Sequence, residues 1–324
     1  MKRHPAETER RPGHFCGEIS FNSPVLGEYR LPCFEIQGNR TGPRLCVMAG
    51  VHVNEVSSID AAIRLRSLLS PDSLTGSVSV IPVVNQPALY EYTQYNCPVD
   101  GKNILFNFPG RPDGSFTEAL CHALLFDWGA DADVLVDMHG GDLRENVAKF
   151  VMFQRTGDPG LDARREAMAK CFDADLVVGF DPSHMDRPGR SLTAMAKLGR
   201  SGVMSEAGAN GVLDDICVRY HTDGVLNVAR LLGMLDGPRI HPTRAQRVCH
   251  QYIWVRCPVD GLFYPAVEPN DHVVRGQRLG EMRNVFGRVL GEVVAPEAGY
   301  VLWRMTHPVL REGAFVLGIA VPAS

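Results

Sequence analysis

Short apolar runs alternate with stretches of helical periodicity through the first two thirds of the chain. Continuous apolar runs, which predict buried strands, occupy residues 45–49, 78–84, 134–136, 176–178 and 202–204. Apolar residues recur at near-helical spacing, which predicts helices, over residues 56–69, 116–128, 162–172 and 212–235. Because strands and helices alternate, the pattern predicts an α/β fold in which a parallel or mixed sheet is sandwiched by helices.

The pattern changes after about residue 240. From residue 248 to residue 321 the sequence holds many short β-type runs that are separated by Gly, Pro and Asp. Short strands at this spacing predict a small all-β module over residues 245–324. The preceding domain then covers residues 16–240, and the polar residues 1–15 are predicted to form a disordered tail.

Composition narrows the classes of partner. The 324 residues include 33 Lys and Arg against 37 Asp and Glu, so the formal net charge is −4 and there is no basic excess for a nucleic acid. No apolar run approaches the roughly 18 residues that cross a membrane, and the N-terminus has no apolar secretion segment. The nine cysteines have no C-x-x-C spacing, which predicts reduced thiols in a cytoplasmic protein. A small-molecule partner is expected, and homo-oligomerisation is left open.

Two of the predicted strands lead into segments with metal-binding residue types. His52 and Glu55 follow the strand at 45–49 and precede a helix, where α/β folds build ligand-binding loops. His139 follows the strand at 134–136 and precedes two glycines, so the chain is leaving the sheet there. Two histidines and one carboxylate form a known ligand set of catalytic zinc, which keeps a fourth position open for water. The sequence therefore predicts one zinc ion at His52, Glu55 and His139.

Two further acidic residues belong to the same pattern. Asp137 lies two residues before His139, on the same side of a strand, and is predicted to support the geometry of the metal site. Glu206 follows the strand at 202–204 and is predicted to take a proton from zinc-bound water. Taken singly, each motif also fits a structural interpretation: a solvated turn for His52 and Glu55, a turn or helix N-cap for Asp137, and an exposed strand end for Glu206.

These segments resemble the succinylglutamate desuccinylase/aspartoacylase family, which is related to the zinc carboxypeptidases. The family pattern G-x-H-G-[DN]-E matches residues 50–55, except that Val53 replaces a glycine; D-x-H matches residues 137–139, and E-x-G matches residues 206–208. The resemblance covers nearly the whole chain and implies a zinc-exopeptidase-like fold followed by a lipoyl-like barrel. Residues 269–280 are typical of such a barrel but carry no lysine at its turn. The resemblance therefore implies a structural cap over the active site rather than a swinging arm.

One segment departs from the family pattern. Gln94 stands near the position of the family's first arginine, which polarises the scissile carbonyl. Leu105 and Phe106 replace an Asn-Arg pair that binds the substrate carboxylate in the relatives. Arginine clamps a carboxylate through two charge-assisted hydrogen bonds, which phenylalanine cannot make. Gln94 is expected to donate only a neutral hydrogen bond to the developing oxyanion.

Two hypotheses account for the missing clamp. In the first, which we favour, the substrate has no carboxylate at this place and meets an apolar pocket, with Asn103 and Phe106 contacting the substrate. In the second, another cation reaches the substrate, and the candidates are Lys102, Arg111 and Arg144, which flank the matched motifs.

Several other residues are predicted to have structural roles. Lacking a partner at metal-ligand spacing, five histidines are predicted to be surface or capped residues: His184, His221, His250, His272 and His307. Three tyrosines are predicted to form the aromatic face of a packed segment: Tyr90, Tyr92 and Tyr95.

The predicted function is a zinc-dependent amidohydrolase that removes an acyl group from an N-acyl amino acid or a related small amide. Zinc-bound water would attack the carbonyl, and Glu206 would deliver its proton to the nitrogen. Two alternatives stay open, namely a metallocarboxypeptidase on short peptides and a metal-binding protein whose catalysis has lapsed. The first needs a carboxylate anchor that the Asn-Arg pair no longer provides. The changes at Val53, Gln94 and Phe106 motivate the second.

Overall fold

The computed structural model describes residues 11–91, 93–181 and 189–322. The α-helices in these ranges are α1 (Val56–Leu68), α2 (Phe116–Ala123), α3 (Pro159–Ala169), α4 (Ser191–Lys197) and α5 (Asp215–Leu231). Shorter helical segments are η2 (Gln86–Ala88), η3 (Ile104–Phe106) and η4 (Leu124–Trp128). The strands up to residue 209 are β1 (Gly13–Ser20), β2 (Arg30–Gln37), β3 (Arg40–Met48), β4 (Thr75–Ile81), β5 (Val134–His139), β6 (Glu145–Gln154), β7 (Leu176–Phe180) and β8 (Ser201–Ala209). The later strands are β9 (Arg247–Arg256), β10 (Gly261–Pro265), β11 (His272–Val273), β12 (Arg278–Arg283), β13 (Val289–Val294), β14 (Gly299–Met305), β15 (Val309–Leu310) and β16 (Phe315–Pro322).

A mixed sheet forms the centre of the molecule, as the alternation of strands and helices predicts. Its strand order is β1-β2-β4-β3-β5-β8-β6-β7-β9-β16-β14-β11. β4, β3, β5 and β8 run parallel to one another. β1 is antiparallel to β2, β2 is antiparallel to β4, and β6 is antiparallel to β8. Parallel strands end at the same edge of the sheet, so the segments that follow β3, β5 and β8 meet there.

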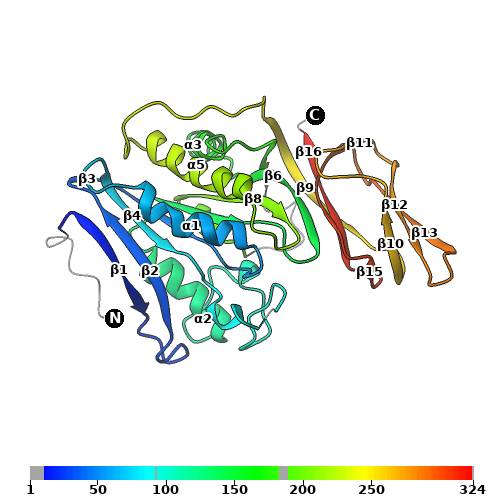
Figure 1. Cartoon of the computed structure of the whole chain (residues 1–324), viewed down its shortest axis with the longest axis horizontal. Helices are drawn as coiled ribbons and strands as arrows, with labels where there is room; N and C mark the ends of the chain where they lie inside the picture. Colours follow the sequence, from blue (N-terminus) through cyan, green and yellow to red (C-terminus); the bar gives the residue numbers. More distant parts are fainter. Residues whose placement is uncertain (1–10, 92, 182–188, 323–324) are drawn as a thin grey trace.

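Helices cover both faces of this sheet. α1 and α5 lie side by side on one face (Figure 1), where Leu65 and Val225 join one apolar core. α2 and α4 contribute Leu120 and Leu192 to a second core on the other face. Across the described residues, no helix has both the length and the apolar character needed to span a membrane.

Some elements have no clear signal in the sequence. β1 has mostly exposed side chains, so it lacks the apolar pattern of a buried strand. It begins at Gly13, so the predicted tail of residues 1–15 is too long at its C-terminal end, while residues 1–10 lie outside the described residues. α4 is short and buried along nearly all its length, and it therefore shows no amphipathic period.

The residues after 245 form an all-β region with its own apolar core, which includes Phe263 and Leu279. A second sheet in the order β13-β12-β10-β15 forms one side of this core. β9, β16, β14 and β11 belong to the central sheet, and β14 pairs with β6 as well as with β16. The all-β region is thus joined to the α/β part by strand pairing (Figure 1). Its likeness to a lipoyl barrel stays a prediction.

The packing of α5 gives a test of this fold. A Cβ atom at Gly224 would lie 2.0 Å from Cδ1 of the buried Phe172. Alanine has a helix propensity about 1 kcal/mol better than that of glycine, but overpacking a core costs about 1–3 kcal/mol. We expect Gly224→Ala to lower the midpoint of urea unfolding. In α3, a Cβ at Gly160 meets only Asp158 at 3.4 Å, so Gly160→Ala is the matched control and should not lower it. An unchanged midpoint for Gly224→Ala would contradict the described packing.

Candidate active site

The segment between β3 and α1 turns sharply and carries two of the predicted metal ligands. Gly50 has φ +62°, and a Cβ there would lie 2.9 Å from Cα of Val83, so this turn requires glycine. Val53 packs with Val83 in a small buried cluster. The main chain then enters α1 with Glu55 as its N-cap residue. The turn therefore directs His52 and Glu55 to the edge of the sheet where β5 ends.

His52, Glu55 and His139 converge at this edge, as the motifs predict. His52 Nδ1 lies 2.7 Å from Glu55 Oε1, and His139 Nδ1 lies 3.0 Å from Glu55 Oε2. One possible ligand atom from each residue lies within 4.8 Å of the other two. All three residues are buried. Both Nδ1 atoms thus face the same carboxylate, as expected of a donor set that can share one ion.

The second nitrogen of each imidazole is held by a different side chain. His52 Nε2 lies 3.1 Å from Asn103 Oδ1, and His139 Nε2 lies 3.0 Å from Asp137 Oδ1. Such outer contacts fix the tautomer and the ring orientation of metal-binding histidines. Ser191 Oγ in turn donates a hydrogen bond of 2.6 Å to Asp137 Oδ2. With two imidazoles, one carboxylate and these supports, the residues fit a catalytic zinc site.

The close contacts shift the pKa values of the three residues. Burial alone would lower the pKa of His52, but the Glu55 carboxylate outweighs it and the pKa is raised. Burial also opposes protonation of His139, yet Asp137 and Glu55 raise its pKa well above the usual value. Burial would raise the pKa of Glu55, but the two imidazoles lower it to about 2. Proton binding to these imidazoles and metal binding to them therefore compete.

Glu206 lies beside His139, because the two residues are directly paired between β5 and β8. Burial raises the pKa of Glu206 most strongly. The His139 imidazole lowers it and the Glu55 carboxylate raises it further, so the pKa lies well above its usual value. A carboxylate that binds protons in this way is suited to proton transfer. The structure thus places the predicted base next to the predicted metal ligands.

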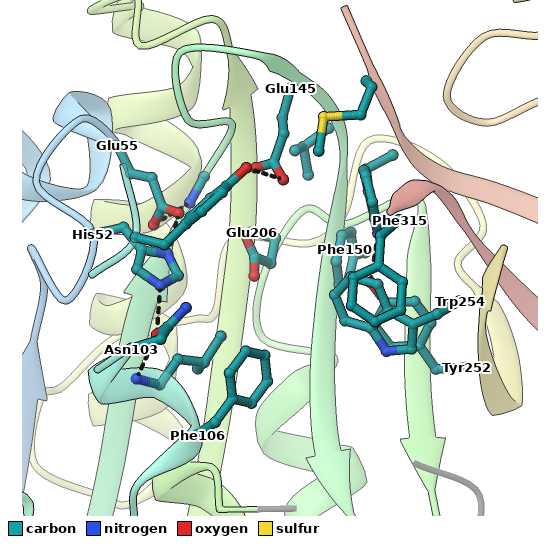
Figure 2. A pocket seen from close by; sticks show the side chains of 16 residues that line it. His52, Glu55, Asn103, Phe106, Glu145, Phe150, Glu206, Tyr252, Trp254 and Phe315 are labelled. Carbon is teal, nitrogen blue, oxygen red and sulfur yellow. Dashed lines mark hydrogen bonds and ion pairs between the residues drawn. The ribbon is translucent and has the colours of Figure 1, made fainter. Parts of the chain in front are cut away.

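A cavity opens in front of these residues, and its opposite side is aromatic. Figure 2 shows His52 and Glu55 on one side, Tyr252, Trp254 and Phe315 on the other, and Glu206 between them. The lining comprises His52, Glu55, Tyr95, Asn103, Leu105, Phe106, Gly140, Glu145, Val147, Phe150, Glu206, Tyr252, Trp254, Trp303, Met305 and Phe315. The aromatic side comes largely from β9, β14 and β16, so the C-terminal region forms part of the site.

The predicted substrate-contacting residues divide into two groups. Asn103 and Phe106 line the cavity, and Asn103 also supports His52. Lys102 Nζ lies 2.9 Å from Glu118 Oε2, and Arg111 Nε lies 3.5 Å from Glu118 Oε1. Neither cation belongs to the lining among the described residues, so the structure does not bring them to the predicted place.

The remaining pair, Gln94 and Arg144, binds each other outside the lining. Arg144 Nη2 donates a hydrogen bond to Gln94 Oε1. In the part of the chain that the structure describes, neither residue lines the cavity. The expected contacts of Gln94 with an oxyanion and of Arg144 with substrate therefore stay predictions.

Two residues have different surroundings from those predicted. Tyr95 lines the cavity and donates a hydrogen bond of 2.7 Å to Glu145 Oε1, so it is not simply a packing residue. His221 is buried on α5, with Nδ1 2.9 Å from Ser205 Oγ, so it is not at the surface. Burial lowers the pKa of His221 to about 3 and keeps this imidazole neutral. His184 and Tyr92 lie outside the described residues.

Sequence reasoning did not identify Glu145 or the aromatic side of the cavity. Glu145 stands at the start of β6 and has no motif around it. Tyr252 and Trp254 are two residues apart on β9 and point the same way. This i, i+2 aromatic pair is a signal for a shared face, but it does not indicate which cavity the face meets.

Comparisons with known proteins give a matching family model and several similar proteins. The family model of the succinylglutamate desuccinylase/aspartoacylase catalytic domain matches residues 41–232. The N-alpha-acetyl-L-2,4-diaminobutyric acid deacetylase of Halomonas elongata is 26% identical over 266 residues, which cover 80% of this chain and 75% of that protein. A product-bound structure of the ectoine utilization protein EutE (DoeB) from Ruegeria pomeroyi is similar with a TM-score of 0.84, at 25% identity and 96% coverage of both chains. A succinylglutamate desuccinylase/aspartoacylase from Rhodobacter sphaeroides gives a TM-score of 0.83, at 25% identity and 97% coverage of both chains.

Removal of one ligand tests the metal site. We expect His52→Ala to lose bound zinc, because two remaining ligands hold the ion much more weakly than three. Zinc per chain would be measured by elemental analysis after dialysis against metal-free buffer. His307→Ala changes an exposed histidine and should keep the zinc content of the parent protein. Equal zinc in the His52→Ala protein would contradict the assignment.

Glu145 gives a test that depends on pH. Burial raises its pKa from 4.5 to about 7, so the folded chain binds a proton more tightly than the unfolded chain. The resulting stabilisation is present below the unfolded pKa and is lost as the pH rises through about 7. The free energy of unfolding of Glu145→Gln minus that of the parent should therefore increase from pH 5 to pH 8. In the metal-free protein this increase should be on the order of 2 kcal/mol. Urea unfolding at both pH values measures this gain, and the exposed Glu292→Gln should show none. A gain of opposite sign would contradict the environment described for Glu145.

Proposed function

Because this chain belongs to the succinylglutamate desuccinylase/aspartoacylase family of amide-bond hydrolases, we propose that it is a zinc-dependent deacylase of N-acyl small molecules. The observation that carries the proposal is the convergence of both Nδ1 atoms on Glu55, with Glu206 beside them. A solvated turn does not need two supported imidazoles around one buried carboxylate.

The proposed mechanism divides the work among the side chains of this cavity. Zinc, when bound by His52, Glu55 and His139, supplies a Lewis acid that polarises the carbonyl and acidifies a water molecule. Glu206 takes the proton of the attacking water and delivers it to the leaving nitrogen. Asn103 and Asp137 hold the two imidazoles in the tautomer that leaves Nδ1 free for the ion.

The cavity lining favours a substrate without the family's carboxylate. Leu105 and Phe106 stand in the wall, and among the described lining residues there is no lysine or arginine. The buried Arg190 guanidinium packs on the Phe106 ring, 5.1 Å from its centroid, but Arg190 does not belong to the described lining, so an anionic group against this wall would meet the ring and not the guanidinium. A metallocarboxypeptidase needs such an anchor, so the wall supports the removal of an acyl group from an amine. The curated relative from Halomonas elongata is named for the deacetylation of an N-acetyl compound that also carries an amine.

We further propose a division of labour along the chain. Residues 16–240 would form the catalytic zinc domain, and residues 245–324 would form a lipoyl-like barrel that closes one side of the cavity. The contribution of Trp254, Trp303 and Phe315 to the lining supports this role for the second part. A cytoplasmic location is proposed because all nine cysteines are free thiols.

Replacement of the proposed base tests the mechanism. Glu206→Gln keeps the shape of the side chain but cannot accept a proton, so kcat should fall by about 10²–10⁴-fold. Because Glu206 is not a ligand, the zinc content of the variant should match that of the parent. Initial rates would be measured over a panel of N-acyl amino acids, N-acyl amines and dipeptides, with the exposed Glu18→Gln as the matched control.

Two outcomes would contradict the proposal. Full activity of Glu206→Gln would exclude this residue as the base. A zinc-loaded parent protein that turns over nothing in the panel would favour a metal-binding protein without catalysis.

A further inference from the structure

A third carboxylate lines the cavity and has no role in the proposed mechanism. Glu145 stands at the start of β6, and its Oε1 atom accepts a hydrogen bond of 2.7 Å from the Tyr95 hydroxyl. It is not part of the group that can share a metal ion, which comprises His52, Glu55 and His139. Tyr95 holds this carboxylate from a backbone conformation with φ +62°, a region that side-chain-bearing residues rarely adopt. The tyrosine and the carboxylate thus form a built feature of the cavity wall.

Aromatic rings face the metal ligands across the same cavity. Trp254 stacks on Tyr252 with ring centroids 4.9 Å apart and an interplanar angle of 18°. The ring centroids of Phe315 and Trp254 are 4.5 Å apart, and those of Trp303 and Trp254 are 5.3 Å apart in an edge-on arrangement. Figure 2 shows this cluster on the side opposite His52, with Glu145 at the upper end of the cavity between the two sides. A substrate whose amide lies at the metal ligands therefore directs its far end toward the rings and Glu145.

Rings and a carboxylate together select a particular chemistry. The faces of tryptophan, tyrosine and phenylalanine attract cations, most strongly where water is excluded. One ring of the cluster already has such a contact, since the Arg256 guanidinium lies 4.1 Å from the Phe315 ring centroid. An apolar group would satisfy the rings but would give the ionised form of Glu145 no partner, whereas a cation would stabilise that form against the burial that raises its pKa to about 7. An anionic group would be repelled by Glu145, and among the described lining residues no lysine or arginine offsets that repulsion.

We propose that the part of the substrate remote from the scissile amide is a cation, an ammonium or alkylated ammonium group held between Glu145 and the Trp254–Phe315 rings. The substrate class is then N-acyl diamines and related amides with a basic group at the far end. The inference rests on the proposed deacylase function, because it places the amide at the metal ligands.

Three matched amides test the charge preference of the zinc-loaded full-length chain. N-acetylputrescine carries a cation at its far end, N-butylacetamide is its neutral counterpart, and N-acetyl-γ-aminobutyrate carries an anion. We expect kcat/KM to be highest for the cation, by about tenfold over the neutral amide, and lowest for the anion. Equal or better turnover of the neutral amide or the anion would overturn the inference while leaving the deacylase function in place.

Variants assign the preference to particular side chains. In Glu145→Gln the ratio of kcat/KM between the cationic and neutral amides should fall toward one, whereas the exposed Glu292→Gln should keep the parent ratio. Trp254→Leu should lower the same ratio, and Trp254→Phe, which retains a ring, should preserve most of it. Because the readout is a ratio, a general loss of active protein does not imitate the expected result. A ratio that is unchanged in both Glu145→Gln and Trp254→Leu would overturn the assignment.

A binding measurement separates this inference from the proposed function. Butylammonium and butyrate would be titrated into the metal-free protein while the fluorescence of Trp254 and Trp303, which line the cavity, is followed. We expect butylammonium to bind more tightly than butyrate, and Glu145→Gln to weaken it by about tenfold. If neither the three amides nor the panel of N-acyl compounds and dipeptides is turned over, the deacylase proposal fails, and the titration still decides the charge preference. Equal or tighter binding of butyrate would overturn the inference.

Discussion

The Glu55 carboxylate, held between the His52 and His139 imidazoles, is the interaction on which the rest of the site depends. Two cationic or metal-bound imidazoles around a buried carboxylate are stable only if each partner is fixed, because an uncompensated buried charge is costly. The Gly50 turn fixes His52 and Glu55, and the parallel pairing of β3 with β5 fixes His139 relative to them. The Gly140 amide donates a further hydrogen bond of 3.1 Å to Glu55 Oε2. The sheet therefore holds these groups in the positions that keep their charges stable in the protein interior.

Local patterns in the sequence were enough to predict that His52, Glu55 and His139 meet at one end of the cavity. His52, Glu55 and His139 each follow an apolar run, and parallel strands bring such positions to one edge of a sheet. Phe106 and Asn103 could be placed near the substrate because they lie in a segment that departs from the family pattern. The cations Lys102 and Arg144 could not be placed by spacing alone, since Lys102 lies in a loop that brings it to Glu118 of α2, and Arg144 and Gln94 meet between two loops. Spacing predicts which residues can approach one another, and loop conformation decides which ones do.

The aromatic end of the cavity could not be predicted for a different reason. Trp254 and Phe315 lie on strands that pair with each other, yet they reach the metal ligands only through the order of the whole sheet. That order depends on contacts between residues far apart in the chain. Similarly, β1 and α4 carry no apolar period, because one is largely exposed and the other largely buried. Apolar periodicity detects elements with one buried face, and it misses elements that are exposed or buried on all sides.

The pairing of β14 with both β16 and β6 joins the two ends of the cavity into one sheet while leaving them encoded in separate stretches of the chain. The candidate metal ligands and Glu206 come from the first two thirds, and most of the rings that face them come from the last quarter. Changes to the rings in the last quarter therefore reshape the cavity without replacing the candidate metal ligands or Glu206. In evolutionary terms, this arrangement lets duplicated copies diverge in the shape of the cavity while inheriting the same His-Glu-His cluster.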